Sequence, residues 1–135
     1  MDNFIAALEH NDRVCEIQFD CLFKLRSEFE RVLYSEAMHK PFPELTRLRL
    51  IQPSTTSYTT VSTLPDLFLG GTAPRLRSLR LDVPFPGVQK LLLSATRLVY
   101  LSLLFIPRSA GYVPPEAMAT SLSALTNLEF LRLEF

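Results

Sequence analysis

The sequence predicts an α/β fold. We expect a right-handed solenoid, a partial horseshoe with parallel strands on the concave face and helices on the convex face. Three observations predict it: one apolar phrase of six residues occurs five times, helical segments lie between the phrases, and successive phrases start 22 to 31 residues apart. Intervals of that length leave room for the crossover that neighbouring parallel strands require. Residues 1–135 are therefore interpreted as one domain of about five repeat units.

The repeated phrase carries apolar residues at its first, fourth and sixth places. The five copies are Val14/Ile17/Phe19, Leu45/Leu48/Leu50, Leu76/Leu79/Leu81, Leu98/Leu101/Leu103 and Leu128/Leu131/Leu133. This is the L-x-x-L-x-L opening of the leucine-rich-repeat signature, whose usual period is roughly 20 to 29 residues. Places four and six alternate as in a strand with one buried face. We therefore predict strands at 14–19, 45–50, 76–81, 98–103 and 128–133.

Proline follows three of the phrases, at Pro53, Pro84 and Pro107. A proline ends a strand because its ring removes a ladder donor. The standard repeat carries Asn or Cys about there. Because these Asn or Cys side chains are missing from the repeats, we expect a less regular horseshoe.

The segments between the phrases predict the helices. Residues 22–38 form the longest amphipathic pattern, and a second helix is expected after Tyr112-Val113, with Ala117, Met118, Leu122 and Leu125 facing inward. Residues 64–69 and 88–94 have room for only a turn or two, and Gly70-Gly71 should end the first of these with positive φ. Residues 54–62, rich in Ser and Thr, are predicted to be an exposed loop.

Composition limits the function classes. Fourteen basic and fourteen acidic residues give a formal net charge of zero, so the positive field that nucleic-acid binding depends on is missing. No apolar run is long enough for a membrane span, and no signal peptide is evident, so we expect an intracellular protein, cytoplasmic or nuclear. Cys15 and Cys21 are interpreted as free thiols. No metal-ligand spacing, phosphate loop or nucleophile motif is present, so we expect no metal, no cofactor and no catalysis.

The expected binding surface consists of the residues at places three, five and seven, which point away from the core. Its candidates are the basic and aromatic residues Arg47, Arg49, Arg80, Tyr100, Phe130 and Arg132. Arginine and large aromatic residues are enriched at interface hot spots. Alternatively, these arginines form a solvated face and pair with Glu16, Asp20, Asp82 or Glu134 on neighbouring strands, and a continuation of the chain covers Tyr100 and Phe130.

Both ends of the sequence suggest a longer array. Phe4 to His10 has the pattern of the last part of a helix from an earlier unit, and the sequence finishes in a strand without a polar cap. Repeat arrays need capping elements. We therefore expect residues 1–135 to be a fragment of a longer solenoid.

Several longer motifs resemble a known family. They are Phe42-Pro43-Glu44-Leu45-Thr46, the run from Leu64 to Leu79, Pro84-Phe85-Pro86-Gly87, Leu91 to Thr96, and Pro115-Glu116-Ala117-Met118-Ala119. Together they resemble the leucine-rich region of the F-box-like proteins expanded in mushroom-forming fungi. The resemblance implies that this region recognises a protein substrate, while an F-box docks on the Skp1 subunit of a cullin ubiquitin ligase. No segment of this chain matches an F-box, so Skp1 would be bound by residues outside it.

Two functions therefore remain open: the substrate-recognition region of an F-box-type adaptor, or a generic leucine-rich scaffold without a ligase role. The sequence upstream of Met1 would separate them.

Overall fold

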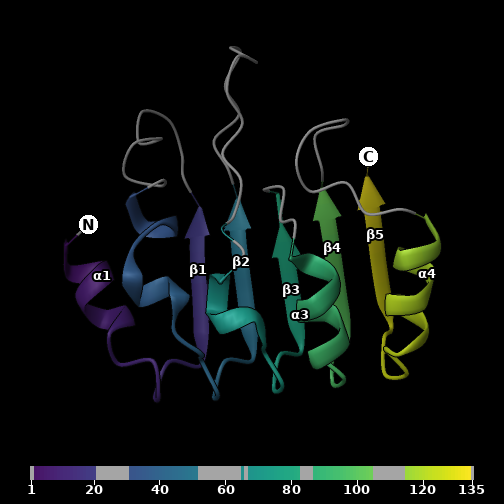
Figure 1. Cartoon of the computed structure of the whole chain (residues 1–135), viewed down its shortest axis with the longest axis horizontal. Helices are drawn as coiled ribbons and strands as arrows, with labels where there is room; N and C mark the ends of the chain where they lie inside the picture. The colour runs from purple at the N-terminus through teal and green to yellow at the C-terminus, as the bar shows by residue number, and fades with distance from the viewer. Residues whose placement is uncertain are drawn as a thin grey trace, which may run out of the picture.

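The computed structural model describes residues 2–20, 31–51, 65, 67–82, 87–104 and 115–134. They form two layers, a parallel sheet and a set of short helices packed against one of its faces (Figure 1). The predicted features at Pro53, Pro84, Pro107 and residues 54–62 lie outside the described residues.

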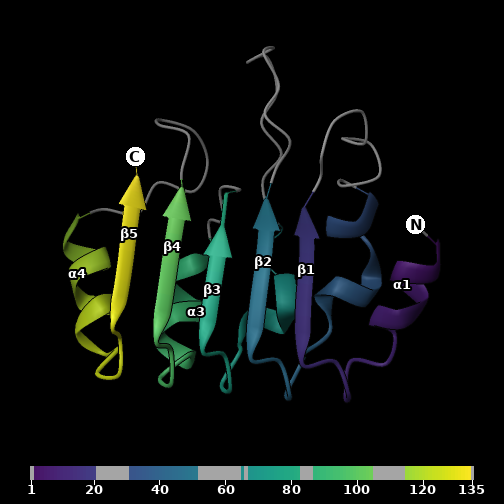
Figure 2. The ribbon, with the colours of Figure 1, turned by 180° about the vertical axis from the view of Figure 1, so that it is seen from behind.

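The sheet has five strands in the order in which they occur in the sequence. All neighbours are parallel, as predicted (Figures 1 and 2). The strands are β1 (Glu16–Asp20), β2 (Arg47–Ile51), β3 (Ser78–Leu81), β4 (Tyr100–Leu104) and β5 (Phe130–Glu134). Because a helical segment returns the chain along the same face between strands, the other face of the sheet carries no helix of the described residues (Figure 2).

The five phrases align place for place across the sheet. The third place, for example, runs from Glu16 through Arg47, Ser78 and Tyr100 to Phe130. Each strand begins at this third place, two residues later than predicted. The first two places belong to the turn before the strand. We attribute the error to the first apolar residue, which is part of the repeated pattern although it precedes the ladder.

Backbone hydrogen bonds connect these turns. The carbonyl of Cys15 accepts from the N–H groups of both Thr46 and Arg47, at 2.7 and 3.3 Å. The carbonyls at the same place of the next three phrases accept from the next turn in the same way; these acceptors are Thr46, Arg77 and Val99. The turns therefore stack as a regular, hydrogen-bonded edge.

The core lies between the sheet and the helices. In the first four phrases the residues at places four and six are at most 7% exposed, which confirms the predicted inward face. The fifth phrase differs, because Leu131 is 44% exposed and Leu133 is only partly buried. The prediction of burial was wrong for Leu131. Alternation selects the face of a strand but not how completely other elements cover that face. Among the described residues β1 also lies at one end of the sheet, yet its Ile17 and Phe19 are buried, and Phe19 packs against Phe4 of α1.

The helical elements lie against one face of the sheet. They are α1 (Asp2–Leu8), the 3-10 helices η1 (Glu36–His39) and η2 (Phe68–Gly71), α3 (Val88–Ser94) and α4 (Pro115–Ser123). In α4 and the turn after it, Met118 and Leu125 are buried, while Ala117 and Leu122 are partly buried against the core. The inward face predicted for this helix is therefore correct.

Two helix predictions need correction. Residues 21–30 of the predicted helix 22–38 lie outside the described residues, and the remainder is not continuous: residues 31–33 are helical, and Ser35 is extended before η1 begins. The Ser35 hydroxyl donates to the Val32 carbonyl at 2.7 Å, which offers the backbone an alternative to helical bonding. The helix predicted at 64–69 instead appears as η2 and includes both glycines.

The turn at Leu69 has three consecutive residues with positive φ. Gly70 and Gly71 have φ of 66° and 81°, as their position predicted, but Leu69 also has φ of 57°. A left-handed conformation costs a residue with a β-carbon roughly 1 to 2 kcal/mol. The Leu69 side chain is fully buried in the core, and this burial offsets the strain.

Candidate protein-binding surface

The side of the sheet that carries no helix of the described residues (Figure 2) is called the outward face here. It consists of the residues at places three, five and seven of each phrase. All six predicted binding residues lie in its register columns. Place three carries Arg47, Tyr100 and Phe130, and place five carries Arg49, Arg80 and Arg132. The sequence therefore located these side chains correctly on one surface.

Tyr100 and Phe130 form the aromatic part of this face. They stand opposite each other on β4 and β5, and their rings stack with centroids 4.5 Å apart and planes 3° apart. Phe130 remains 45% exposed. A stacked pair of this kind is held in place by its own contact and still presents apolar area to solvent.

The arginines of β2 and β3 line a small cavity beside the aromatic pair. Its volume is about 210 Å³, and its walls are Gln18, Arg47, Leu48, Arg49, Ser78, Arg80 and Tyr100. Sites for drug-sized ligands usually measure roughly 300 to 1,000 Å³, so this cavity fits a single side chain better. It brings three of the predicted arginines together with Tyr100, which the sequence could only place on adjacent strands.

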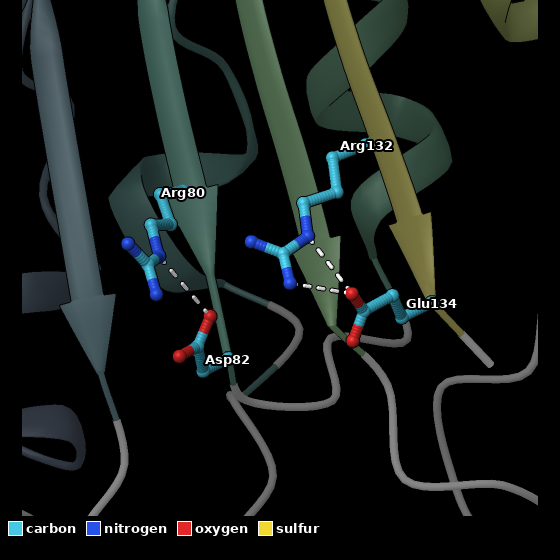
Figure 3. A network of polar contacts seen from close by, with 4 residues as sticks. All are labelled: Arg80, Asp82, Arg132 and Glu134. Carbon is cyan, nitrogen blue, oxygen red and sulfur yellow. Dashed lines mark hydrogen bonds and ion pairs between the residues drawn. The ribbon is translucent and has the colours of Figure 1, made fainter.

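Two of the predicted arginines are paired with carboxylates, but not across strands. Arg80 lies 3.5 Å from Asp82, and Arg132 donates through Nε to Glu134 at 2.9 Å (Figure 3). Each partner is two residues further along the same chain segment, so the expected pairing between neighbouring strands was wrong for these residues. The reason is the alternation of the strand, which places residues i and i+2 on the same face.

Glu134 also affects the protonation of Arg132. The hydrogen bond to Glu134, together with the charge of that carboxylate, raises the pKa of Arg132 above its ordinary value. Both groups of the pair are about half exposed, so solvent screens the attraction and its contribution to stability is small. The pair fixes the orientation of the guanidinium, which points from β5 towards β4 in Figure 3.

Ser102 occupies the middle of the same face. It stands between Arg80 and Arg132 in the register, yet it is only 1% exposed. Among the described residues its hydroxyl has no hydrogen-bond partner. A buried unsatisfied hydroxyl is unfavourable, typically by about 1 to 3 kcal/mol. The outward position predicted for Ser102 is correct. Its burial was not predictable, because it depends on how the side chains of the flanking residues are oriented.

The remaining arginines differ in their surroundings. Arg47 is exposed and its side chain forms no ion pair within the described ranges, whereas Arg49 is half-buried and makes further interactions. Arg47 is therefore the more available cation of β2.

A second concavity was missed by the sequence reading. We call it the turn groove: it has a volume of about 740 Å³ and lies along the turns that precede the strands, where it is lined by Thr46, Arg75, Arg77, Arg97, Val99, Thr126, Asn127, Leu128 and Glu129. Only places three, five and seven were considered from sequence. Alignment of place two and of the residue before each phrase would have shown the arginines of this edge.

The described residues do not suggest a metal centre or a membrane segment. Within them, no group of three His, Cys, Asp or Glu residues could hold a metal ion. None of their helices is long and apolar enough to cross a bilayer. The predicted free thiol at Cys15 is present and exposed, and Cys21 lies outside the described residues.

Comparison with family models, with curated proteins and with solved structures finds no match to this chain.

Proposed function

We propose that the chain is a non-catalytic protein-interaction module of leucine-rich-repeat type, whose outward face binds a protein partner. The observation that carries the proposal is the partly exposed Tyr100–Phe130 stack beside a cavity lined by Arg47, Arg49 and Arg80. Aromatic and arginine side chains in a preorganised cluster supply most of the energy at protein interfaces. The cavity is of a size to receive one side chain of the partner.

The repeat architecture supports the same proposal. Five parallel strands in sequence order, with their phrases aligned place for place, are what a right-handed leucine-rich solenoid would produce. In such an array each unit contacts its neighbours, and the strands together present an extended surface for binding.

We further propose that this module is the substrate-recognition region of an F-box-type adaptor of a cullin ubiquitin ligase, acting inside the cell. The support is the family resemblance of the motifs between Phe42 and Ala119. Skp1 would be bound by an F-box outside this chain, and the protein substrate would contact the outward face.

Replacing both Tyr100 and Phe130 with alanine is expected to reduce partner recovery at least tenfold in affinity purification with quantitative mass spectrometry. Loss of a central aromatic hot spot costs about 2 kcal/mol or more, which exceeds a factor of ten. The matched control replaces two exposed residues of the helical layer, Lys90 and Glu116, with alanine. Loss of partners in the control but not in the aromatic variant would move the binding site to the helical layer.

The ligase role has its own test. The transcript upstream of the Met1 codon is expected to encode an F-box, and the protein containing it should co-purify with Skp1. A full-length protein that binds partners through the outward face but never recovers Skp1 would be a scaffold, and the adaptor proposal would fail while the binding proposal stands.

A further inference from the structure

The turn groove is a separate and regular feature of the fold. Its walls come from the turns before β2 to β5, whereas the candidate binding surface comes from the strands themselves. Successive turns are held by the paired hydrogen bonds to the carbonyls of Thr46, Arg77 and Val99, at 2.8 to 3.1 Å. Adjacent turns therefore repeat at the strand spacing of about 4.8 Å, and side chains at the same place form regular columns.

The groove carries more positive than negative charge. Its lining includes Arg75, Arg77 and Arg97 but only one acidic residue, Glu129. Arg75 donates to Glu44 of the preceding turn at 2.8 Å, so this guanidinium is already engaged. Arg77 and Arg97 are exposed, and their side chains form no ion pair within the described ranges. On a chain with zero formal net charge, this is a local concentration of unpaired cations in a concave site.

We propose that the turn groove binds an acidic segment of a protein partner, rich in Asp and Glu, with Arg77 and Arg97 pairing with its carboxylates. A guanidinium can donate two parallel hydrogen bonds to one carboxylate, and it is always charged. A concave site with excess charge of one sign also concentrates ligands of the opposite sign.

The shape of the groove favours a peptide segment over a free anion. At about 740 Å³ it falls within the roughly 300 to 1,000 Å³ of sites for drug-sized ligands, which is more than a lone inorganic anion fills. Val99 and Leu128 add partly exposed apolar area, and Thr126 and Asn127 add hydrogen-bonding groups. An extended chain with alternating acidic and apolar side chains matches this mixture, whereas a lone inorganic anion uses only the arginines.

The test is direct binding of a defined probe. Fluorescence anisotropy would follow a fluorescein-labelled peptide of glutamates around a central leucine, titrated with the full 135-residue chain at low ionic strength. Replacing Arg77 and Arg97 together with alanine should weaken binding at least tenfold. The control replaces Lys40 and Lys90 with alanine; it removes the same net charge from exposed residues that line neither concavity, and it should retain binding.

A second variant is expected to increase the affinity, an effect that misfolding would not produce. Glu129→Gln removes the acidic residue of the groove and should tighten binding of the same peptide severalfold, since it removes a repulsive charge. An unchanged or weaker affinity for this variant would overturn the proposal. Equal loss in the lysine control would overturn it as well, because binding would then follow overall charge.

Two further arms distinguish the source of the negative charge. The same peptide with glutamines in place of glutamates should not bind, and millimolar inorganic phosphate should compete only weakly. The proposal of a partner that binds through carboxylates would be refuted if a phosphate ion, or a phosphorylated but otherwise neutral peptide, bound more tightly than the glutamate peptide. The outward-face variant Tyr100→Ala/Phe130→Ala should bind the peptide normally, so the two proposals can fail independently.

Discussion

Replacing Phe68 with alanine is expected to lower the free energy of unfolding by about 3 to 5 kcal/mol, the usual range for a buried phenylalanine. Phe68 begins η2, its side chain is fully buried, and η2 packs against η1. Removal of the ring leaves a cavity that the sheet and two short helical elements can fill only partly. The loss should appear as a lower denaturant midpoint with an unchanged slope.

The adjacent residue provides the control for this variant. Leu67 precedes Phe68 and is 62% exposed, so Leu67→Ala should change the stability by less than about 0.5 kcal/mol. Comparable losses at both positions would mean that Phe68 is not the buried member of this turn.

Leu79→Ala should cost about 2 to 5 kcal/mol, whereas Leu131→Ala should cost much less, because the penalty depends on the cavity that remains. Both leucines occupy place four of their phrases, so the chemical change and the position within the phrase are matched. They differ in exposure, which is 0% for Leu79 and 44% for Leu131. Chemical denaturation followed by circular dichroism would measure both.

Two outcomes of that comparison would contradict the fold description. If Leu131→Ala were as damaging as Leu79→Ala, the described arrangement around β5 would be wrong. If Arg80→Ala were as damaging as Leu79→Ala, the inward and outward faces of β3 would be misassigned by one residue.

The sequence was sufficient to predict the sheet, because its information is periodic. The apolar alternation within each phrase indicated the buried face, and the intervals between phrases allowed parallel crossovers. The alternation occurs in all five phrases, and each of the four intervals is long enough for a crossover. The strand starts were two residues early because Leu45, Leu76 and Leu98 are as buried as the strand leucines but belong to the turns.

Other features depend on neighbours that periodicity does not describe. The exposure of Leu131 depends on how completely other elements cover β5, and the left-handed conformation of Leu69 accompanies the burial of its side chain. The sequence correctly predicted which residues lie on the outward face, but it did not predict the carboxylates with which Arg80 and Arg132 pair. Rotamers decide that Arg80 pairs with Asp82 rather than with a residue of another strand.

Contact between the outward face and a protein partner can be measured by site-specific photo-cross-linking in the full-length protein. A photoreactive amino acid would be placed either at Arg47, on the wall of the small cavity, or at Lys90, in the helical layer. The partner recovered by the unmodified protein should form a cross-linked adduct from position 47 and little or none from position 90. An adduct from position 90 alone would show that the partner contacts the helical layer and not the outward face.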